Sequence, residues 1–344
     1  MKYRVAQLGC SPDRGRTHTQ AFLANADRFE LVGLCDMNSD RLSAVSTEFQ
    51  IDCTYPNLEE MLEREHPDIF CFVTHPNIRL EMVQSGIAAG VKAIALEKPM
   101  ATSLREAQEI MRCCDEAGVK LIVSNQHKYN GRWQRLQQRI DAGAIGQVQM
   151  IYASAKGWLL SYATHLIDWM LFFNHSSPAT WVVGHVHGKE AIMDRWNTHP
   201  SPDYLLGKFE FANGVQGLLE CGTLARGLYP AGEHYNIWLD AGITIYGTEG
   251  YAQVIMGKDA CIVSQQGTEI LPELASDPPQ QVLYLRDLAD WLDDPSNIHP
   301  CNGQTSYHGF EIMMGAWLSG LDCRKLELPL TRNDDVVERS KVEL

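Results

Sequence analysis

Residues 91–99 read VKAIALEKP, an apolar run that ends in the tripeptide Glu97-Lys98-Pro99. Similar short apolar runs recur through the first 125 or so residues, and helical patterns separate them. Strands that alternate with helices predict βαβ units and a parallel, doubly wound sheet. Ligands bind such a sheet outside the carboxyl ends of its strands. The sequence therefore predicts that the ammonium of Lys98 faces a bound ligand.

The alternation assigns elements to the whole first part of the chain. We expect strands at residues 5–8, 29–35, 69–73, 93–96 and 120–123. We expect helices at residues 18–26, 41–49, 58–65, 78–89 and 103–117. The last of these opens on Ser103 with Glu106 three positions later, a capping box that satisfies free amides at a helix start. Residues 1–127 are predicted to form a Rossmann-type domain of this kind.

After about residue 127 the strands become longer and alternate between apolar and polar residues. We expect strands at residues 148–155, 181–187, 204–211, 215–223, 235–239, 243–246 and 252–255, and helices at 132–142, 163–173 and 306–321. Asn213-Gly214 lies between two of these strands and is a strong hairpin signal. Residues 128–344 are therefore predicted to form an α+β domain with a mainly antiparallel open sheet, covered by helices on one face.

Composition limits the classes of partner. The 344 residues suffice for two domains with separate cores. A formal net charge of −14 argues against nucleic acid or an anionic membrane as a partner. The ten cysteines favour reduced thiols in a cytoplasmic protein, and no run reaches membrane-spanning length. The twelve histidines do not cluster with cysteine or carboxylate at ligand spacing, so no metal is expected.

A glycine-containing turn, GCSPDRG at residues 9–15, follows the first expected strand. The dinucleotide fingerprint has glycines two and five positions after the first, where the pyrophosphate approaches a helix start. Here the next glycine stands six positions after the first, so the fingerprint is not met. An ordinary strand-to-helix loop is the alternative interpretation. The candidate cofactor contacts in this turn are Gly9, Ser11, Arg14 and Gly15.

Two further stretches lie at the carboxyl ends of expected strands. Asp36 follows the second strand, about 20 residues beyond Gly15, where a carboxylate accepts hydrogen bonds from an adenosine ribose. It would repel a 2′-phosphate, which favours NAD over NADP, although Arg41 would partly offset this; a solvated loop aspartate is the alternative. The third strand is followed by polar or rigid residues that suit the ribose or nicotinamide side, namely Thr74, Pro76 and Asn77.

The stretch from Trp158 to Trp169 carries the candidate acid–base chemistry. His165 and Asp168 stand three residues apart on an expected helix, so they share a face and the carboxylate can orient the imidazole. A core histidine with its bonds satisfied is the alternative. Aromatic and histidine side chains are candidates for stacking on sugar, with core packing as the alternative for each. The candidate substrate contacts are Trp158, Tyr162, His165, Tyr129 and His308.

Together these residues resemble the glucose–fructose oxidoreductase and inositol dehydrogenase family (Gfo/Idh/MocA) over nearly the whole chain. The matching motifs are THPN at residues 74–77, EKP at 97–99, AGAIG at 142–146, HLID at 165–168, IYGTEG at 245–250 and LELPL at 326–330. The resemblance implies an NAD(P)-dependent oxidoreductase for sugars or cyclitols, with its site between the Rossmann domain and the open sheet.

Carried over by position, the resemblance implies that Lys98 contacts the substrate hydroxyl and the nicotinamide ribose, and that His165 is the general acid/base. Glu97 and Gln126 are added to the cofactor contacts. Many members have an aspartate four residues before that histidine, and this chain has Ser161 there. The candidates to support His165 in its place are Asp168, Lys98 and Tyr162.

The expected reaction is oxidation of a secondary alcohol. His165 accepts the hydroxyl proton as hydride leaves the same carbon for NAD⁺, and Lys98, with a depressed pKa, stabilises the developing alkoxide. Two alternatives remain: an NAD-retaining, redox-neutral enzyme that cleaves glycosides, and a catalytically silent nucleotide-binding sensor. An exposed apolar sheet face drives association, so a homodimer or homotetramer through the second domain's sheet is expected.

Overall fold

The computed structural model describes residues 2–194, 198–229 and 240–344. The chain divides into two compact units. The first comprises Met1–Ala101, Glu106–Tyr129 and Pro278–Ser306, and the second comprises Thr102–Arg105, Asn130–Asp277 and Tyr307–Leu344. This division differs from the single boundary expected at residue 127, because a late segment of the chain returns to the first unit.

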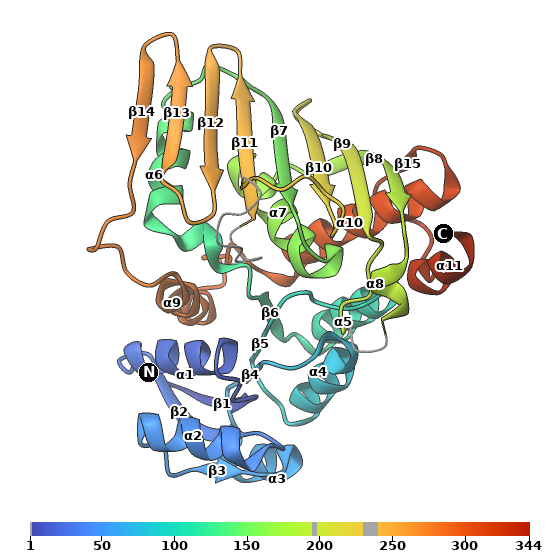
Figure 1. Cartoon of the computed structure of the whole chain (residues 1–344). Coiled ribbons are helices and arrows are strands. Elements are labelled where there is room, and N and C mark those ends of the chain that lie inside the picture. Colours follow the sequence, from blue (N-terminus) through green and yellow to red (C-terminus); the bar gives the residue numbers. More distant parts are fainter. Residues whose placement is uncertain (1, 195–197, 230–239) are drawn as a thin grey trace. The chain divides into compact units, whose positions relative to one another are not determined.

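The first unit contains a parallel sheet, as predicted, and it has six strands where five were expected (Figure 1). The strands are β1 (Tyr3–Leu8), β2 (Phe29–Cys35), β3 (Thr54–Tyr55), β4 (Ile69–Phe72), β5 (Ala93–Leu96) and β6 (Lys120–Val123). Their order in space is β3-β2-β1-β4-β5-β6. All residues of β4 and β5 are buried, which is why these strands read as continuous apolar runs without alternation. The strand order reverses between β1 and β4, and a doubly wound sheet binds its ligand at such a switch point.

Helices separate these strands, and one more helix joins the unit from far along the chain. They are α1 (Arg14–Ala24), α2 (Ser39–Phe49), α3 (Leu58–Glu65), α4 (Arg79–Ala88), α5 (Leu104–Ala117) and α9 (Gln280–Asp293), with 3₁₀ turns η1 (Pro76–Ile78) and η2 (Gln126–Tyr129). The sequence analysis did not predict α9, which packs against α1 and η2. Its Tyr284, Leu285 and Leu288 are fully buried in the same core as Val5 and Phe22.

The second unit contains a mixed, mostly antiparallel sheet, as predicted. The described strands are β7 (Val148–Ala155), β8 (Ala179–His187), β9 (Tyr204–Phe211), β10 (Gln216–Cys221), β11 (Ala241–Gly247), β12 (Gly250–Ile255), β13 (Ala260–Ser264), β14 (Gly267–Leu271) and β15 (Leu326–Glu327). Their order is β14-β13-β12-β11-β7-β10-β9-β8-β15, in which β7 and β10 pair in parallel. Asn213-Gly214 makes the turn of the antiparallel β9–β10 hairpin, as expected. The strand expected at 235–239 falls outside the described residues.

The helices of the second unit are α6 (Gly131–Asp141), α7 (Leu159–Phe173), α8 (Glu190–Met193), α10 (Gly303–Asp322) and α11 (Val336–Glu343). Helix α10 begins at the end of the first unit's last segment. Helix α7 is buried almost throughout its length. Helix α7 packs on β7, β10 and β11. The rings of Trp133 and Trp169 lie 4.8 Å apart by their centroids, and both side chains are buried. Trp133 is therefore a core residue of this unit.

Candidate nucleotide-binding and catalytic residues

The turn after β1 is built around two glycines that a larger residue cannot replace. Gly9 has a φ of +97°, and a Cβ on it would lie 2.3 Å from the carbonyl oxygen of Val73. A Cβ on Gly15 would lie 2.6 Å from the carbonyl oxygen of Gly9. Ser11 accepts a hydrogen bond from the Gly15 amide at its Oγ, 2.9 Å away. The turn thus leaves bare backbone at the start of α1, which is where a pyrophosphate binds in this class of fold.

A residue that the sequence analysis did not single out holds this turn in place. Gln7 is a fully buried polar residue in β1, and its Nε2 donates to the carbonyl oxygens of Gly9 (3.1 Å) and Gly15 (2.9 Å). The only signal in the sequence was a glutamine inside an apolar strand. Buried polar groups are normally hydrogen-bonded, and the amide of Gln7 is satisfied by the backbone of the turn itself.

Asp36 lies at the end of β2, against the glycine turn. Its Oδ2 accepts the amide hydrogen of Cys10 at 2.8 Å, and its Oδ1 accepts that of Asn38 at 2.8 Å. The carboxylate therefore connects the turn to the start of α2, whose Asn38 cap accepts the amide of Arg41. Asp36 thus stands where dinucleotide-binding folds have the acidic residue that contacts the ribose. The ribose contact itself stays a prediction.

Arg14, the first residue of α1, contacts Glu97, which directly follows β5. Its Nε and Nη2 lie 2.8 Å and 2.6 Å from Oε1 of Glu97. Its Nη2 also donates to Ser124 Oγ at 3.0 Å and to Gln281 Oε1 at 2.9 Å. The guanidinium expected at the cofactor thus pairs with a buried carboxylate, and no local sequence pattern pointed to this pairing.

Glu97 is buried and also accepts a hydrogen bond from His18, whose Nε2 lies 2.9 Å from Oε1. Burial alone opposes ionisation of Glu97, but the charge of Arg14 and the bond from His18 hold the pKa of its carboxyl well below the usual range. Burial lowers the pKa of His18, so a neutral ring donates to an ionised Glu97. The other ring nitrogen of His18 lies 3.5 Å from Cys71 Sγ. Glu97 is thus the centre of a charged network inside the first unit.

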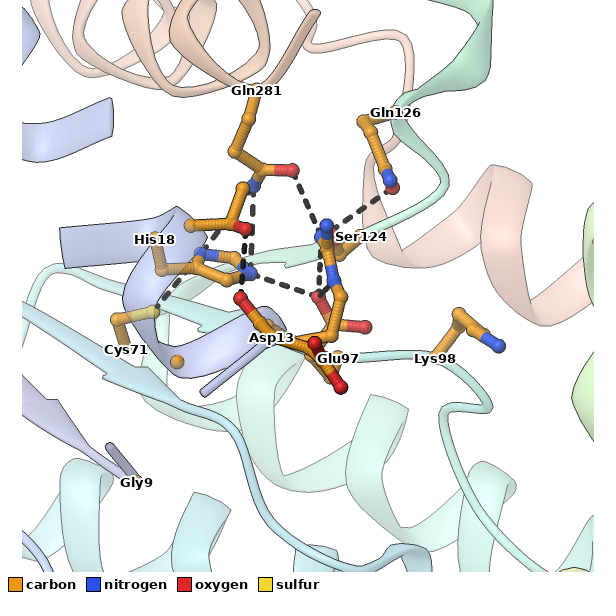
Figure 2. Close-up of polar contacts among 12 residues, drawn as sticks. Gly9, Asp13, His18, Cys71, Glu97, Lys98, Ser124, Gln126 and Gln281 are labelled. Atoms are coloured by element: carbon orange, nitrogen blue, oxygen red, sulfur yellow. Dashed lines mark hydrogen bonds and ion pairs between the residues drawn. The ribbon is translucent and has the colours of Figure 1, made fainter. Parts of the chain in front are cut away.

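Lys98 follows directly, and the peptide between Lys98 and Pro99 is cis. Figure 2 shows its amine pointing away from the network around Glu97. Burial lowers the pKa of Lys98 to about 8; Arg14 and Arg79 act in the same direction, and the charge of Glu97 opposes them. An amine in this state exchanges protons near neutral pH and is suited to proton transfer or to stabilising a negative oxygen.

Two buried oxygen atoms near the strand ends are placed to hydrogen-bond with a polar ligand. Thr74 Oγ1, beyond β4, and Asn125 Oδ1, beyond β6, have no hydrogen-bond partner among the described residues. Buried polar groups are normally paired, so such atoms suit the ribose or amide groups of a dinucleotide. Of the other residues expected here, Pro76 is buried, Asn77 is exposed, and Gln126 is buried with Oε1 3.3 Å from Ser124 Oγ. Asn125 was not among the residues expected at the cofactor.

In the second unit, helix α7 carries Ser161, His165 and Asp168, all buried. The rings of His165 and Trp169 are stacked, with centroids 6.3 Å apart. Trp158, at the start of α7, is 39% exposed and lies parallel to His199, with an angle of 11° between the rings. The helix thus brings the predicted acid–base group and an exposed aromatic ring to its first two turns.

Two predicted substrate contacts lie in other surroundings. Tyr129 belongs to the first unit's core and donates from its hydroxyl to Asp287 Oδ2 at 2.8 Å. His308 in the second unit accepts the Ala179 amide at Nε2, 2.9 Å away, and its Nδ1 lies 3.7 Å from Glu311 Oε2. These contacts connect secondary-structure elements within each unit, and a substrate role for either residue stays a prediction.

The described part of the chain contains no group of three or more histidine, cysteine or acidic side chains that could hold a metal ion. None of its helices has the length and apolar character needed to cross a bilayer. All ten cysteines are free thiols.

Comparison with known proteins gives matches to both halves of the chain. Residues 3–125 match an oxidoreductase family with an NAD-binding Rossmann fold, and residues 133–253 match the GFO/IDH/MocA C-terminal domain. The D-apiose dehydrogenase of Paraburkholderia graminis is 32% identical over 145 residues, which cover 42% of this chain and 38% of that enzyme. The match thus spans well under half of that relative's length.

Two longer matches extend the comparison. The 1,5-anhydro-D-fructose reductase of Ensifer adhaerens is 25% identical over 250 residues, 70% of this chain and 72% of that enzyme. The solved structure of a levoglucosan dehydrogenase, in complex with NADH and levoglucosan, superimposes with a TM-score of 0.79. It is 14% identical and covers 96% of this chain and 100% of that one, a likeness that shows the fold.

Proposed function

Because the chain belongs to the Gfo/Idh/MocA family of NAD-binding oxidoreductases, we propose that it moves a hydride between nicotinamide and a secondary alcohol carbon of a sugar, sugar derivative or cyclitol. The observation that carries the proposal is Lys98 at the carboxyl end of β5, with its pKa lowered to about 8. A surface lysine would keep a pKa near 10.5, and perturbed values of this kind cluster at functional sites.

The first unit's residues fit NAD. Gly9 and Gly15 supply the bare backbone that a pyrophosphate needs, and Asp36 supplies an acceptor for a ribose. Thr74 and Asn125 each offer a buried polar atom with no hydrogen-bond partner among the described residues. When bound, the nicotinamide ring supplies the hydride acceptor for the oxidation.

Side chains of the protein accept the substrate proton and stabilise the negative charge that develops on the substrate oxygen. We assign His165 as the group that takes the proton from the substrate hydroxyl through a ring nitrogen, with Asp168 as the candidate support on the same helix. Protonated Lys98 stabilises negative charge on the substrate oxygen as the carbon–hydrogen bond breaks. Glu97 is paired with Arg14, and the amine of Lys98 points away from that carboxylate.

The sugar class is supported by the relatives and by one feature of the second unit. The named relatives include an apiose dehydrogenase and an anhydrofructose reductase. The half-exposed Trp158 and parallel His199 offer a flat surface of the kind that packs against the C–H face of a sugar ring.

The test is a substrate screen with the whole protein. It is incubated with NAD⁺ or NADP⁺ and a panel of pyranoses, inositols, uronates and glycosides, while absorbance at 340 nm and products by mass spectrometry are followed. NADH formed with one sugar class supports the proposal. Glycoside cleavage without a lasting absorbance change contradicts net oxidation and supports redox-neutral cleavage. Cofactor binding without reaction of any compound in the panel counts against this substrate class.

We also propose that the protein self-associates through the second unit's sheet. Val183 and Tyr246 are each 37% exposed, while their strand neighbours Val182 and Ile245 are fully buried, so they lie on the face opposite the core. Exposed apolar side chains on a sheet face favour association. Light scattering of the wild type and of Val183→Asp is the test: a multimer that the substitution dissociates supports this interface, and a monomeric wild type contradicts it.

A further inference from the structure

A buried arginine lies beneath the loop that carries Lys98. Arg79 is the first residue of α4, and only 1% of it is exposed. Its Nη1 donates to the carbonyl oxygen of Pro99, and its Nη2 donates to those of Thr74 and Lys98, each at 3.2 Å. One guanidinium therefore connects the loop after β4 to the loop after β5.

Burying Arg79 places a positive charge in the interior of the first unit. A guanidinium is expensive to bury, and here its hydrogen bonds go to neutral carbonyl groups. Burial lowers the pKa of Arg79 to about 10, with Glu97 and Glu106 as the carboxylates whose charge opposes that change. The side chain thus places a positive charge next to Lys98, in a region where charges interact strongly.

We propose that Arg79 is a positioning residue for Lys98: its guanidinium holds the carbonyl groups of Lys98 and Pro99 against that of Thr74, and it places a positive charge beside the lysine. The catalytic use of Lys98 rests on the proposed function, whereas the contacts and the charge effect do not. An amine whose proton affinity is matched to the working pH transfers protons and donates hydrogen bonds more effectively than an ordinary lysine.

Three charged groups that shift the pKa of Lys98 come from three neighbouring elements. Glu97, at the end of β5, favours the charged amine, while Arg14 of α1 and Arg79 of α4 oppose it. His127 in η2 is neutral at ordinary pH, because burial, followed by the charges of Arg14 and Lys98, lowers its pKa to about 3. Glu97 is hydrogen-bonded to Arg14 and His18, and no such carboxylate bond is described for Arg79. Arg79 is therefore the cation whose removal should change Lys98 most cleanly.

The experiment measures the titration of Lys98 by NMR in whole protein labelled with ¹³C and ¹⁵N lysine, without substrate. The resonance is assigned by its loss in Lys98→Arg. Arg79→Met keeps an unbranched apolar stem and removes the guanidinium with its charge, and Arg64→Met, at an exposed arginine of α3, is the matched control. We expect the midpoint of Lys98 to rise by about one pH unit in Arg79→Met and to stay unchanged in Arg64→Met. A folded Arg79→Met protein with the wild-type midpoint overturns the charge effect.

A second variant tests whether Arg79 holds the backbone of the Lys98 loop. It also keeps the proposal testable if Arg79→Met does not fold. Arg79→Lys keeps the charge but cannot reach three carbonyls from two nitrogens. We expect it to keep the Lys98 midpoint and to show faster amide hydrogen exchange in residues 97–101. Unchanged exchange, or a shifted midpoint, overturns the proposal. Because neither readout uses a substrate, failure of the proposed reaction would show separately, as turnover that survives in Lys98→Ala.

Discussion

Arg14 and Glu97 stand 83 positions apart, and Nη2 of Arg14 lies 2.6 Å from Oε1 of Glu97. The pair joins the glycine turn to the end of β5. We predict that Glu97→Gln lowers the free energy of unfolding at pH 7 by up to about 3 kcal/mol, because it leaves the partly buried cation of Arg14 without its charged partner. Urea unfolding measures this.

The matched control is the neighbouring exposed pair of Arg16 with Glu48, where Glu48→Gln should change stability by less than about 1 kcal/mol. The pKa of Glu97 is lower in the folded than in the unfolded chain. Its contribution is therefore present above the unfolded pKa and is lost as pH falls through the folded value. A difference between wild type and Glu97→Gln that persists unchanged in acid would contradict this account.

Lys98→Ala should lose turnover by ~10²- to 10⁴-fold while NADH affinity stays close to that of the wild type. The reason is that the amine acts on charge that develops only as the substrate reacts. Steady-state kinetics with the sugar found in the screen measure turnover, and fluorescence titration with NADH measures its affinity. The control is Lys92→Ala, which removes a lysine at the opposite end of β5 that pairs with Asp68 at 2.8 Å. Equal turnover in both variants would refute the assignment.

The lowered pKa of Lys98 also predicts two pH effects. If the protonated amine stabilises the substrate oxygen, kcat/KM for oxidation falls as pH rises through about 8. In the unfolded chain the lysine binds its proton up to about 10.5, so the free energy of unfolding should rise with pH between the two values. Lys98→Met should consequently be more stable than wild type at pH 7, by up to about 3 kcal/mol and by less where water reaches the amine. Denaturant curves at pH 7 and 10 test the stability effect; a less stable variant at pH 7 would be the contrary result.

Asp36→Ala should weaken NADH binding by about 10-fold or more and narrow the preference for NADH over NADPH. The substitution removes the acceptor of the Cys10 and Asn38 amides and the charge that would repel a 2′-phosphate. Fluorescence titration with both cofactors is the measurement, with Asp40→Ala on the exposed start of α2 as control. If NADPH already binds the wild type as tightly as NADH does, the role given to Asp36 is wrong.

His165→Ala should lose oxidation by ~10²- to 10⁴-fold, the usual contribution of a general base. His187→Ala removes an exposed histidine from the end of β8 in the same unit and should leave the rate unchanged. Stopped-flow measurement of the first turnover separates the chemical step from product release. A wild-type rate of that step in His165→Ala would transfer the role to another residue, with Tyr162 the first to test.

The fold followed from the sequence where burial leaves a clear pattern. Strands β2, β5, β6, β7 and β9 have the expected bounds, because apolar runs or strict alternation end at turn residues. Strand β14 was missed, since it has no buried residue and hence no hydrophobic period. Helix α9 has an apolar face, but no local rule shows that it packs on α1, more than 250 residues earlier in the chain.

The candidate site was predictable to a similar degree. Asp36 and Lys98 were found because each directly follows a strand, and the strand ends of a parallel sheet converge. The direction of Arg14 and the anchoring roles of Gln7 and Arg79 were not found. Each of these depends on a partner distant in the sequence, and a lone polar residue beside an apolar stretch does not reveal which backbone groups it will satisfy.

Helix α9 also determines when the first unit can be finished on the ribosome. Strands β1 to β6 leave the exit tunnel well before Tyr284 and Leu288, which fill the core against them. At ordinary elongation rates the nascent chain waits roughly ten seconds with that apolar surface uncovered. During this interval the chain is a natural client for chaperones, and a fragment expressed without residues 278–306 would keep the same uncovered surface permanently.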